Sequence, residues 1–328
     1  MDAFKALVAD REGDEVRIGT RRMTAAQLPE GEVLVRVVYS SVNYKDGLAS
    51  IPNGNIVKDY PFIPGIDLAG IVVSSEDSRF REGDEILVTG FGLGVNRFGG
   101  YSEYAKVPAD WVVKLPAGLS LKEAMIFGTA GFTAAMSVQA LQAGGVDPKS
   151  GPVLVTGATG GVGSVSIAIL AKLGYEVVAS TGKKEAADEL LRLGATRVIG
   201  REELFPEKPR PLGRETWAGV VDCVGGKSLA SILSNVKYGG TVAASGLTGG
   251  SELETTVFPF ILRGIRLIGI DSVQASMSAR RRVWELLASE YKPEGLASIA
   301  SEISLEQIPS ALSAILSGQS RGRVVVKL

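Results

Sequence analysis

Short apolar runs punctuated by glycine and proline characterise the first 120 residues of the chain. Glu32–Tyr39 alternates charged and apolar positions before it turns apolar, a pattern that predicts a half-buried β-strand. Short runs at regular spacing favour an antiparallel sheet that rolls into a barrel. The other runs with strand character are Ile66–Val73, Glu85–Thr89, Tyr101–Val107 and Trp111–Leu115.

From Leu121 onward, apolar strands alternate with helical segments. This alternation is typical of an α/β fold with a doubly wound parallel sheet. The predicted strands are Val153–Val155, Glu176–Ser180, Arg197–Ile199, Ala218–Asp222, Thr241–Ser245 and Arg266–Asp271, with a last strand at Arg323–Leu328. The predicted helices are Lys122–Ala130, Thr133–Gln142, Ser164–Ala171, Lys184–Leu193, Ser228–Val236, Ala279–Ser289 and Leu305–Leu316.

The length of the chain indicates how many domains it forms, and its charge indicates which partners it can bind. A chain of 328 residues exceeds one ordinary core, so two domains are expected. A net charge of −1 gives no reason to expect nucleic acid or an anionic membrane surface as a partner. The uncharged stretch Ala124–Val146 contains glycine and polar residues, so we interpret it as a buried core helix and not as a membrane span. With no apolar signal region at the N-terminus, we expect a cytoplasmic protein.

The sequence contains no histidine, and Cys223 is its only cysteine. Catalysis by a Ser-His-Asp or Cys-His arrangement is therefore excluded, as is a zinc site built from histidine and cysteine. We predict no metal site. Cys223 lies in an apolar, strand-like run, where we expect it to be a buried packing residue.

Pro152–Tyr175 contains a strand, a glycine-dense turn and a helix in direct succession. The turn matches the dinucleotide fingerprint G-x-G-x-x-G, with Ala158 in the first glycine position. Gly160 allows the backbone to approach a pyrophosphate, and Gly163 lets the helix pack closely on the strand. The N–H groups of the first helical turn attract phosphate. We predict that a dinucleotide binds to Thr159, Gly160, Gly161, Val162 and Gly163.

The end of the second predicted strand indicates which dinucleotide binds. In this fold an acidic residue at that place grips the ribose 2′-hydroxyl of NAD. Here the segment Ala179–Lys184 holds hydroxyl groups and two lysines but no acid. We therefore predict NADPH over NADH, with Ser180, Thr181, Gly182 and Lys183 around the 2′-phosphate, although a solvated lysine pair would give the same pattern.

Several long motifs in order along nearly the whole chain resemble one family. They are SSVNYKD (Ser40–Asp46), PFIPGIDLAG (Pro61–Gly70), GGYSEYAKV (Gly99–Val107), GTAGFTAA (Gly128–Ala135), TGATGGVGS (Thr156–Ser164), SGLTGG (Ser245–Gly250) and TTVFPFILRGIRLIGIDSV (Thr255–Val273). The chain resembles the zinc-free, quinone oxidoreductase-like branch of the medium-chain dehydrogenase/reductase superfamily. Within that branch the motifs match the NADPH-dependent acrylyl-CoA reductases.

The resemblance implies a GroES-like β-barrel catalytic domain and a Rossmann domain with a doubly wound parallel sheet. The catalytic domain would span residues 1–120 and be completed by residues 293–328, with the Rossmann domain at residues 121–292. Substrate and nicotinamide would meet between the two. This branch reduces activated C=C bonds, and we expect a homodimer in which the edge strands at Leu262–Ile270 pair.

Reduction of an enone or enoyl thioester needs donors for the developing enolate and a proton for the α-carbon. The resemblance implies that Asn43 hydrogen-bonds the nicotinamide ribose and that Tyr44 touches both cofactor and substrate. Tyr44 is our candidate proton donor, the alternative being an exposed aromatic that packs on the cofactor. Lys45 and Asp46 are adjacent and would pair with each other. Asp67 is either a buried structural carboxylate or a functional one.

Further cofactor contacts are implied by the resemblance. Thr129 would lie near the nicotinamide, the alternative being a helix cap. Arg197 would stack over the adenine, the alternative being a solvated surface arginine. Leu247, Ile261 and Ser272 complete the predicted cofactor-binding set, and Leu247 and Ser272 follow strands at the edge where ligands bind.

The sequence thus favours NADPH-dependent reduction of a small enoyl thioester such as acrylyl-CoA. The alternatives are a quinone or enone reductase of the same fold and a non-catalytic NADPH-binding protein.

Overall fold

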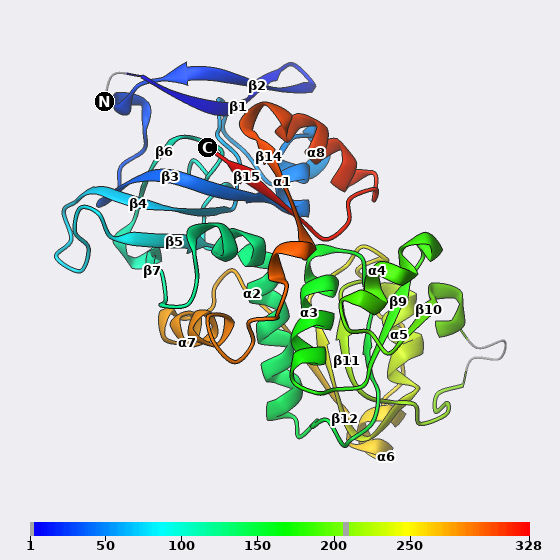
Figure 1. The fold of residues 1–328 in the computed structure, drawn as a ribbon. Coiled ribbons are helices and arrows are strands. Elements are labelled where there is room, and N and C mark those ends of the chain that lie inside the picture. Colours follow the sequence, from blue (N-terminus) through cyan, green and yellow to red (C-terminus); the bar gives the residue numbers. More distant parts are fainter. Residues whose placement is uncertain (1–2, 206–209) are drawn as a thin grey trace. The chain divides into compact units, whose positions relative to one another are not determined.

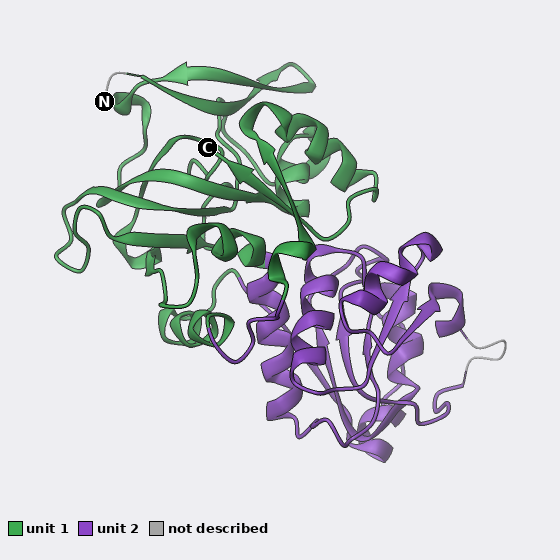
Figure 2. Ribbon diagram, in the orientation of Figure 1, with its two compact units in different colours: residues 1–129, 273–288, 295–328 green, residues 130–272, 289–294 purple. Residues whose placement is uncertain are grey.

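The computed structural model describes residues 3–205 and 210–328 and divides into two compact units (Figure 2). Unit 1 comprises residues 1–129, 273–288 and 295–328, and unit 2 comprises residues 130–272 and 289–294. Compared with the predicted domain bounds, unit 1 extends to Thr129 and also includes the segment 273–288. That segment joins unit 1 because Arg280 is fully buried there and donates to the Thr89 carbonyl oxygen at 2.9 Å.

Unit 1 is built on a largely antiparallel sheet of seven strands (Figure 1). Its order is β14-β15-β3-β4-β5-β7, and β6 pairs with the first part of β3. The β-rich character predicted for this region is confirmed. The strands are β3 (Val33–Val42), β4 (Asp67–Ser75), β5 (Glu85–Thr89), β6 (Tyr104–Val107), β7 (Val113–Lys114), β14 (Ala300–Ser304) and β15 (Arg323–Lys327).

A two-stranded hairpin of β1 (Phe4–Glu12) and β2 (Glu15–Met23) precedes this sheet. The sequence analysis predicted neither strand. Most β2 positions are exposed or half-buried, so this strand lacks the alternation of apolar and polar residues that marks a buried face. Apolar residues of β1 nevertheless enter the core of unit 1, where Phe4 and Leu7 pack with Ile63 and Ile308.

The helices of unit 1 are α1 (Tyr44–Ala49), α7 (Met277–Leu287) and α8 (Ile308–Leu316). The sequence analysis did not predict α1. It begins directly after β3, and Asn43 occupies its N-cap position. Gly47 of α1 leaves no room for a side chain, because an added Cβ would lie 2.9 Å from Leu316 of α8. A short helix packed this closely against another is stabilised by tertiary contact more than by its own propensity.

Helix α2 (Leu121–Ala143) joins two segments predicted as separate helices. The interruption is at Gly128, whose φ of 52° and ψ of −157° are not helical. Within the described residues, α2 is long and apolar enough to cross a membrane by length and composition, but 78% of its most apolar window is buried inside the protein. That burial agrees with the prediction of a core helix.

Unit 2 contains a six-stranded, fully parallel sheet in the order β10-β9-β8-β11-β12-β13. This order is that of a dinucleotide-binding doubly wound sheet, as predicted. The strands are β8 (Val153–Val155), β9 (Val177–Thr181), β10 (Arg197–Gly200), β11 (Trp217–Asp222), β12 (Val236–Ala244) and β13 (Arg266–Gly269). The helices are α3 (Gly161–Lys172), α4 (Ala187–Arg192), α5 (Gly226–Leu233) and α6 (Phe258–Arg263).

Two details of unit 2 differ from the prediction. The apolar stretch 262–270 is not one long strand, because α6 continues to Arg263 and ends at Gly264 in the left-handed conformation, which leaves β13 with four residues. Helix α5 ends at Leu233, and β12 already starts at Val236. The first difference comes from a turn at Gly264 inside apolar sequence, which hydrophobic periodicity does not resolve. The second arises because β12 continues through Gly239 and Gly240 and so begins five residues before the predicted strand at Thr241.

Candidate functional site

The glycine turn of unit 2 joins the carboxyl end of β8 to the start of α3. Gly163 packs so closely on this turn that an added Cβ would lie 2.4 Å from the Gly157 carbonyl oxygen. The first intrahelical hydrogen bond runs from the Ser164 N–H to the Gly160 carbonyl oxygen at 2.9 Å. The N–H groups of the preceding helical residues therefore have no intrahelical acceptor, and Gly160 is exposed. This arrangement has the geometry that binds a pyrophosphate.

The end of β9 lies beside this turn. The Ala158 N–H donates to the Ser180 carbonyl oxygen at 3.2 Å, which connects the glycine turn directly to β9. The side chains of Ser180 and Thr181 are buried, and the Thr181 hydroxyl accepts from the Lys183 N–H at 3.0 Å. The structure thus brings the segment from Ser180 to Lys183 to the same sheet edge as the glycine turn, as the sequence predicted.

Sequence analysis missed a second basic residue at this edge. Arg201 follows β10, whose last residue, Gly200, pairs with Thr181 of β9. A Cβ added to Gly182 would lie 2.8 Å from the Arg201 Nε atom, so the guanidinium group covers the Gly182 backbone. The signal was a basic residue two positions after the third predicted strand, but only the parallel register of β9 and β10 places it over Gly182.

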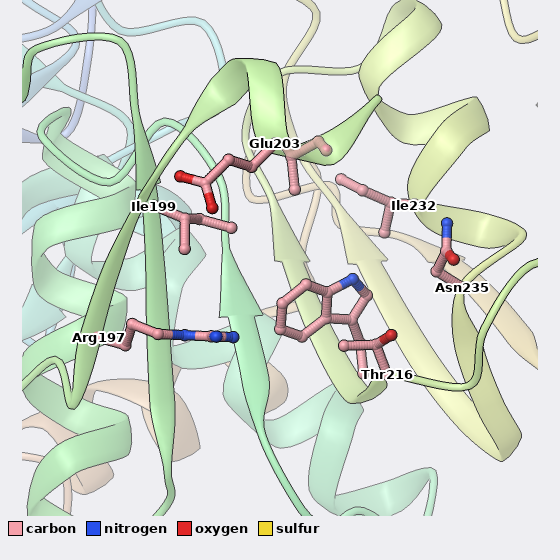
Figure 3. A pocket seen from close by; sticks show the side chains of 8 residues that line it. Arg197, Ile199, Glu203, Thr216, Ile232 and Asn235 are labelled. Carbon is pink, nitrogen blue, oxygen red and sulfur yellow. The ribbon is translucent and has the colours of Figure 1, made fainter. Parts of the chain in front are cut away.

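Arg197 lies at the other end of the sheet. It pairs with Val178 at the start of β10, toward the amino ends of the strands, whereas Thr181 pairs with Gly200. Arg197 lines a hollow of about 230 Å³ together with Thr216, Ile232 and Asn235 (Figure 3). The structure therefore does not bring Arg197 together with the glycine turn, because it stands at the wrong end of its strand for the predicted adenine contact.

Ile261 does not follow the carboxyl end of a strand. It belongs to α6, and Arg263 of the same helix donates to the carbonyl oxygens of Ser234 at 2.8 Å and Val236 at 3.1 Å. Val236 is the first residue of β12, so this part of α6 lies at the amino ends of the strands. The assignment of Ile261 was based on its motif alone, and no strand end positions it at the ligand edge.

Leu247 and Ser272 do follow carboxyl ends of strands. Leu247 is 68% exposed in the loop after β12, and an added Cβ at Gly225 would lie 3.3 Å from its Cα. Ser272 is buried just past β13. Both remain predicted cofactor contacts.

Two residues that the sequence analysis did not single out hold the middle of this edge together. The Thr156 hydroxyl donates to Asp222 Oδ1 at 2.8 Å and accepts from the Cys223 N–H at 2.9 Å. Asp222 Oδ2 accepts from the Gly225 N–H at 2.8 Å, and burial raises the pKa of Asp222. These bonds join the loops after β8 and β11, where the strand order reverses and ligands bind in such sheets. Cys223 is half-buried and not fully buried as predicted, and the burial of its thiol raises the pKa of that group to about 12.

Unit 1 contains a buried polar cluster around Asp67, the first residue of β4. One carboxylate oxygen, Oδ2, accepts from Ser41 Oγ at 2.6 Å, Asn43 Nδ2 at 2.8 Å and the Thr129 N–H at 2.9 Å. The other accepts from the Thr129 hydroxyl at 2.5 Å. Asp67 has no exposed surface, so the structure supports its reading as a structural carboxylate.

The buried cation of this cluster is Arg323, which sequence analysis did not single out. Its guanidinium donates to Ser41 Oγ at 2.9 Å, Asn43 Oδ1 at 3.2 Å and two backbone carbonyl groups, and its Nη2 lies 3.9 Å from Asp67. Burial lowers the pKa of Arg323, and the nearby carboxylates oppose that shift. Gly128 touches the same groups, because an added Cβ would lie 2.5 Å from Asp67 Oδ2 and 2.7 Å from Arg323 Nη2.

These contacts change the interpretation of Asn43 and Thr129. Both polar atoms of the Asn43 amide are bound inside unit 1, so its contact with a cofactor ribose stays a prediction. The Thr129 hydroxyl donates to Asp67 inside unit 1, which is not the helix cap that was considered, and its place near the nicotinamide stays a prediction. Both residues position the start of α1 and the kink of α2 at Gly128.

Asp46 does not pair with Lys45, as the sequence suggested, because its side chain is fully buried. Its two oxygens accept from the backbone N–H groups of Asn43 at 2.8 Å and Ile66 at 2.9 Å. Burial, with a smaller contribution from the charge of Asp67, raises the pKa of Asp46 to about 7. Asp46 is thus a structural group that holds β3, α1 and the start of β4 together.

Tyr44 differs from its neighbours. It is the first residue of α1, directly after the buried Asn43, and its side chain is 45% exposed. The buried cluster therefore supports a tyrosine whose ring faces away from the core.

No group of three or more His, Cys, Asp or Glu side chains able to hold a metal ion occurs within residues 3–205 and 210–328.

The chain matches two family models, the alcohol dehydrogenase GroES-like domain over residues 29–117 and the zinc-binding dehydrogenase over residues 161–289. It is 55% identical to YhfP of Bacillus subtilis, a protein named for a proposed quinone oxidoreductase activity, over 99% of both chains. It is 50% identical to the acrylyl-CoA reductase AcuI of Ruegeria pomeroyi over 98% of both chains.

Solved structures give the same result. The structure of Bacillus subtilis yhfP with NAD bound superposes with a TM-score of 0.98 over all of both chains. The yhdH oxidoreductase of Salmonella enterica in complex with NADP superposes with a TM-score of 0.96 at 47% identity over 99% of both chains. The chain therefore belongs to the medium-chain dehydrogenase/reductase family, in its quinone oxidoreductase-like branch.

Proposed function

We propose that this chain is an NADPH-dependent reductase of activated C=C bonds, with acrylyl-CoA or a similar small enoyl thioester as substrate. The observation that carries the proposal is the edge of the unit 2 sheet. There the N–H groups of α3, the segment Ser180–Lys183 and Arg201 lie together, and the loop at the end of β9 contains no carboxylate. The names of AcuI and of the NADP complex support the choice of substrate and cofactor.

NADPH, when bound, supplies the hydride for the β-carbon of the substrate and leaves as NADP⁺. The chain must then stabilise negative charge on the carbonyl oxygen and deliver a proton to the α-carbon, which turns the C=C bond into a single bond. Tyr44 is our candidate for both tasks, because its ring is exposed while its backbone is fixed by the buried Asn43 and Asp46. The residues around the α3 N-terminus bind and orient the phosphates.

The second candidate function is reduction of a quinone or enone, which the name given to YhfP favours. Both activities use the same hydride donor, so they differ in the substrate alone. The test is NADPH consumption by the purified protein with acrylyl-CoA, with 1,4-benzoquinone and with no substrate. A higher kcat/KM for acrylyl-CoA would support the thioester. Consumption with the quinone alone would favour the second candidate, and no consumption with either would indicate a non-catalytic NADPH-binding protein.

We also propose a homodimer in the cytoplasm. Strand β13 ends the described sheet, and the adjoining α6 region exposes Val257 (65%), Phe258 (45%), Ile261 (68%) and Leu262 (55%). An open strand edge beside exposed apolar side chains is an association surface. Two copies would bury it through a twofold, isologous contact. Light scattering at micromolar concentration should give the mass of a dimer, and the mass of a monomer would contradict the proposal.

A further inference from the structure

The hollow that contains Arg197 lies at the amino ends of strands in unit 2 (Figure 3). Arg197 begins β10, Trp217 begins β11, and Asn235 directly precedes β12. Strands β9 and β8 separate β10 from β11 in the sheet, so Arg197 and Trp217 stand on strands about 14 Å apart. The glycine turn follows the carboxyl end of β8, so this hollow of about 230 Å³ is a separate feature from the dinucleotide edge.

Apolar side chains form much of the wall of the hollow. They are Ile199, Leu204, Trp217 and Ile232, which all belong to one hydrophobic core cluster of unit 2. Trp217 is 7% exposed and Ile232 is 1% exposed, so the wall is the edge of a packed core. A flat apolar group placed against it would remove the remaining apolar surface from water.

Two hydrogen-bond donors in the hollow are available to a ligand. The Arg197 side chain is exposed and extends from β10 toward Thr216 (Figure 3). Its guanidinium makes no hydrogen bond or ion pair with the residues that the structure describes, and the Trp217 indole N–H makes none with them either. Glu203 also lines the hollow, but one of its carboxylate oxygens accepts from the Gly200 N–H at 2.8 Å.

We propose that this hollow binds a small aromatic monocarboxylate, with the carboxylate on Arg197 and the ring against Trp217 and Ile232. A guanidinium group presents paired N–H donors that match the two oxygens of a carboxylate. One cation balances one negative charge, and the Glu203 carboxylate in the same hollow would repel the second charge of a phosphate. This binding site goes beyond the proposed reductase function and does not depend on it.

The experiment titrates benzoate into the full chain and follows the indole N–H signals by NMR. The chain contains three tryptophans, so the spectrum shows three such signals, and Trp217→Phe identifies one of them. We expect benzoate to shift the Trp217 signal saturably, with a Kd on the order of 1 mM. The signals of Trp111 and Trp284, which do not line the hollow, should stay in place.

Variants and other probes separate the charge from the ring. Arg197→Gln should weaken benzoate binding about fivefold or more, and Arg197→Lys should weaken it less. The matched control is Arg192→Gln, an exposed arginine at the end of α4, which should leave the Kd unchanged. Acetate lacks the ring and benzyl alcohol lacks the charge, so each should bind about tenfold more weakly. Inorganic phosphate should not displace benzoate. Melting temperatures confirm that each variant folds.

Three results would overturn the proposal. They are the absence of a Trp217 shift at about 20 mM benzoate, an unchanged Kd in Arg197→Gln, and displacement of benzoate by NADPH. The expected result is that saturating NADPH leaves the Kd for benzoate within about twofold, because the two ligands occupy opposite ends of the strands. No reduction is measured, so a failure of the proposed function would not alter this result.

Discussion

The buried cluster around Asp67 in unit 1 and the open sheet edge of unit 2 use similar residues for opposite purposes. Both combine hydroxyl groups, an arginine and a glycine that leaves space for it. Arg323 is 2% exposed and donates to acceptors within unit 1, whereas Arg201 is exposed and lies over Gly182 with no such acceptor. The two arginines differ in how many of their hydrogen-bond partners the chain itself supplies. A polar group whose partners are all supplied by the chain maintains the fold, and one presented without partners is available to a ligand.

The largest expected effect tests the structural half of this comparison. Arg323→Met leaves the Asp67 carboxylate buried without its cation, so the free energy of unfolding should fall by about 3–5 kcal/mol. Urea denaturation measures it, with Arg321→Met, at an exposed position two residues earlier, as the control. The control should change stability by less than about 0.5 kcal/mol. A stable Arg323→Met protein would mean that the cluster does not hold unit 1 together.

The next effect is a dependence of stability on pH that originates in Asp46. Its pKa rises from 3.8 in the unfolded chain to about 7 in the folded protein because of burial. Between these values the folded protein retains a proton that the unfolded chain releases, so this contribution is complete below about pH 4 and is lost as pH rises through about 7.

Denaturation between pH 4 and pH 8 measures that contribution. The native protein should lose on the order of 2–4 kcal/mol relative to Asp46→Asn across this window. Asp46→Asn should itself be less stable at low pH, because one of the two backbone N–H groups would face the amide NH₂ instead of an acceptor. Parallel pH curves for the two proteins would show that Asp46 does not titrate in this range.

Tyr44→Phe tests the exposed tyrosine that directly follows the buried Asn43. The ring and its packing are retained, so NADPH affinity should hold. If the hydroxyl acts only in the transition state, kcat and kcat/KM should fall together by roughly 10²-fold. Steady-state kinetics over a range of pH gives both constants. A variant with full kcat at every pH would exclude Tyr44 as the acid and direct attention to the cofactor ribose or to solvent.

The last prediction is that removal of metal ions has no effect on this protein. The chain has no histidine and a single cysteine, so prolonged EDTA treatment should change neither the rate of NADPH consumption nor the melting temperature. Elemental analysis of the purified protein provides the control. One zinc ion per chain would contradict the prediction and would require a ligand set made of carboxylates.

The sequence by itself determined the features that depend on neighbouring positions. The strand, glycine turn and helix around Gly160, the alternation that produces a parallel sheet, and the absence of an acid after β9 are all local patterns, and the structure agrees with them. They also sufficed to predict a dinucleotide site on one sheet edge. The hairpin of β1 and β2 escaped prediction because β2 has too little buried apolar surface to produce a pattern.

The tertiary structure alone decided which polar residues find all their hydrogen-bond partners within the protein. Arg323 and Ser41 are 282 positions apart, yet their hydrogen bond helps to make Asn43 and Thr129 parts of a buried cluster. Arg197 begins β10 and Arg201 directly follows its last residue, and only the parallel register of β10 with β9 places Arg201 over Gly182 and Arg197 at the opposite edge. Neither fact can be read from composition or spacing, because hydrogen-bond saturation depends on the three-dimensional neighbours that folding supplies.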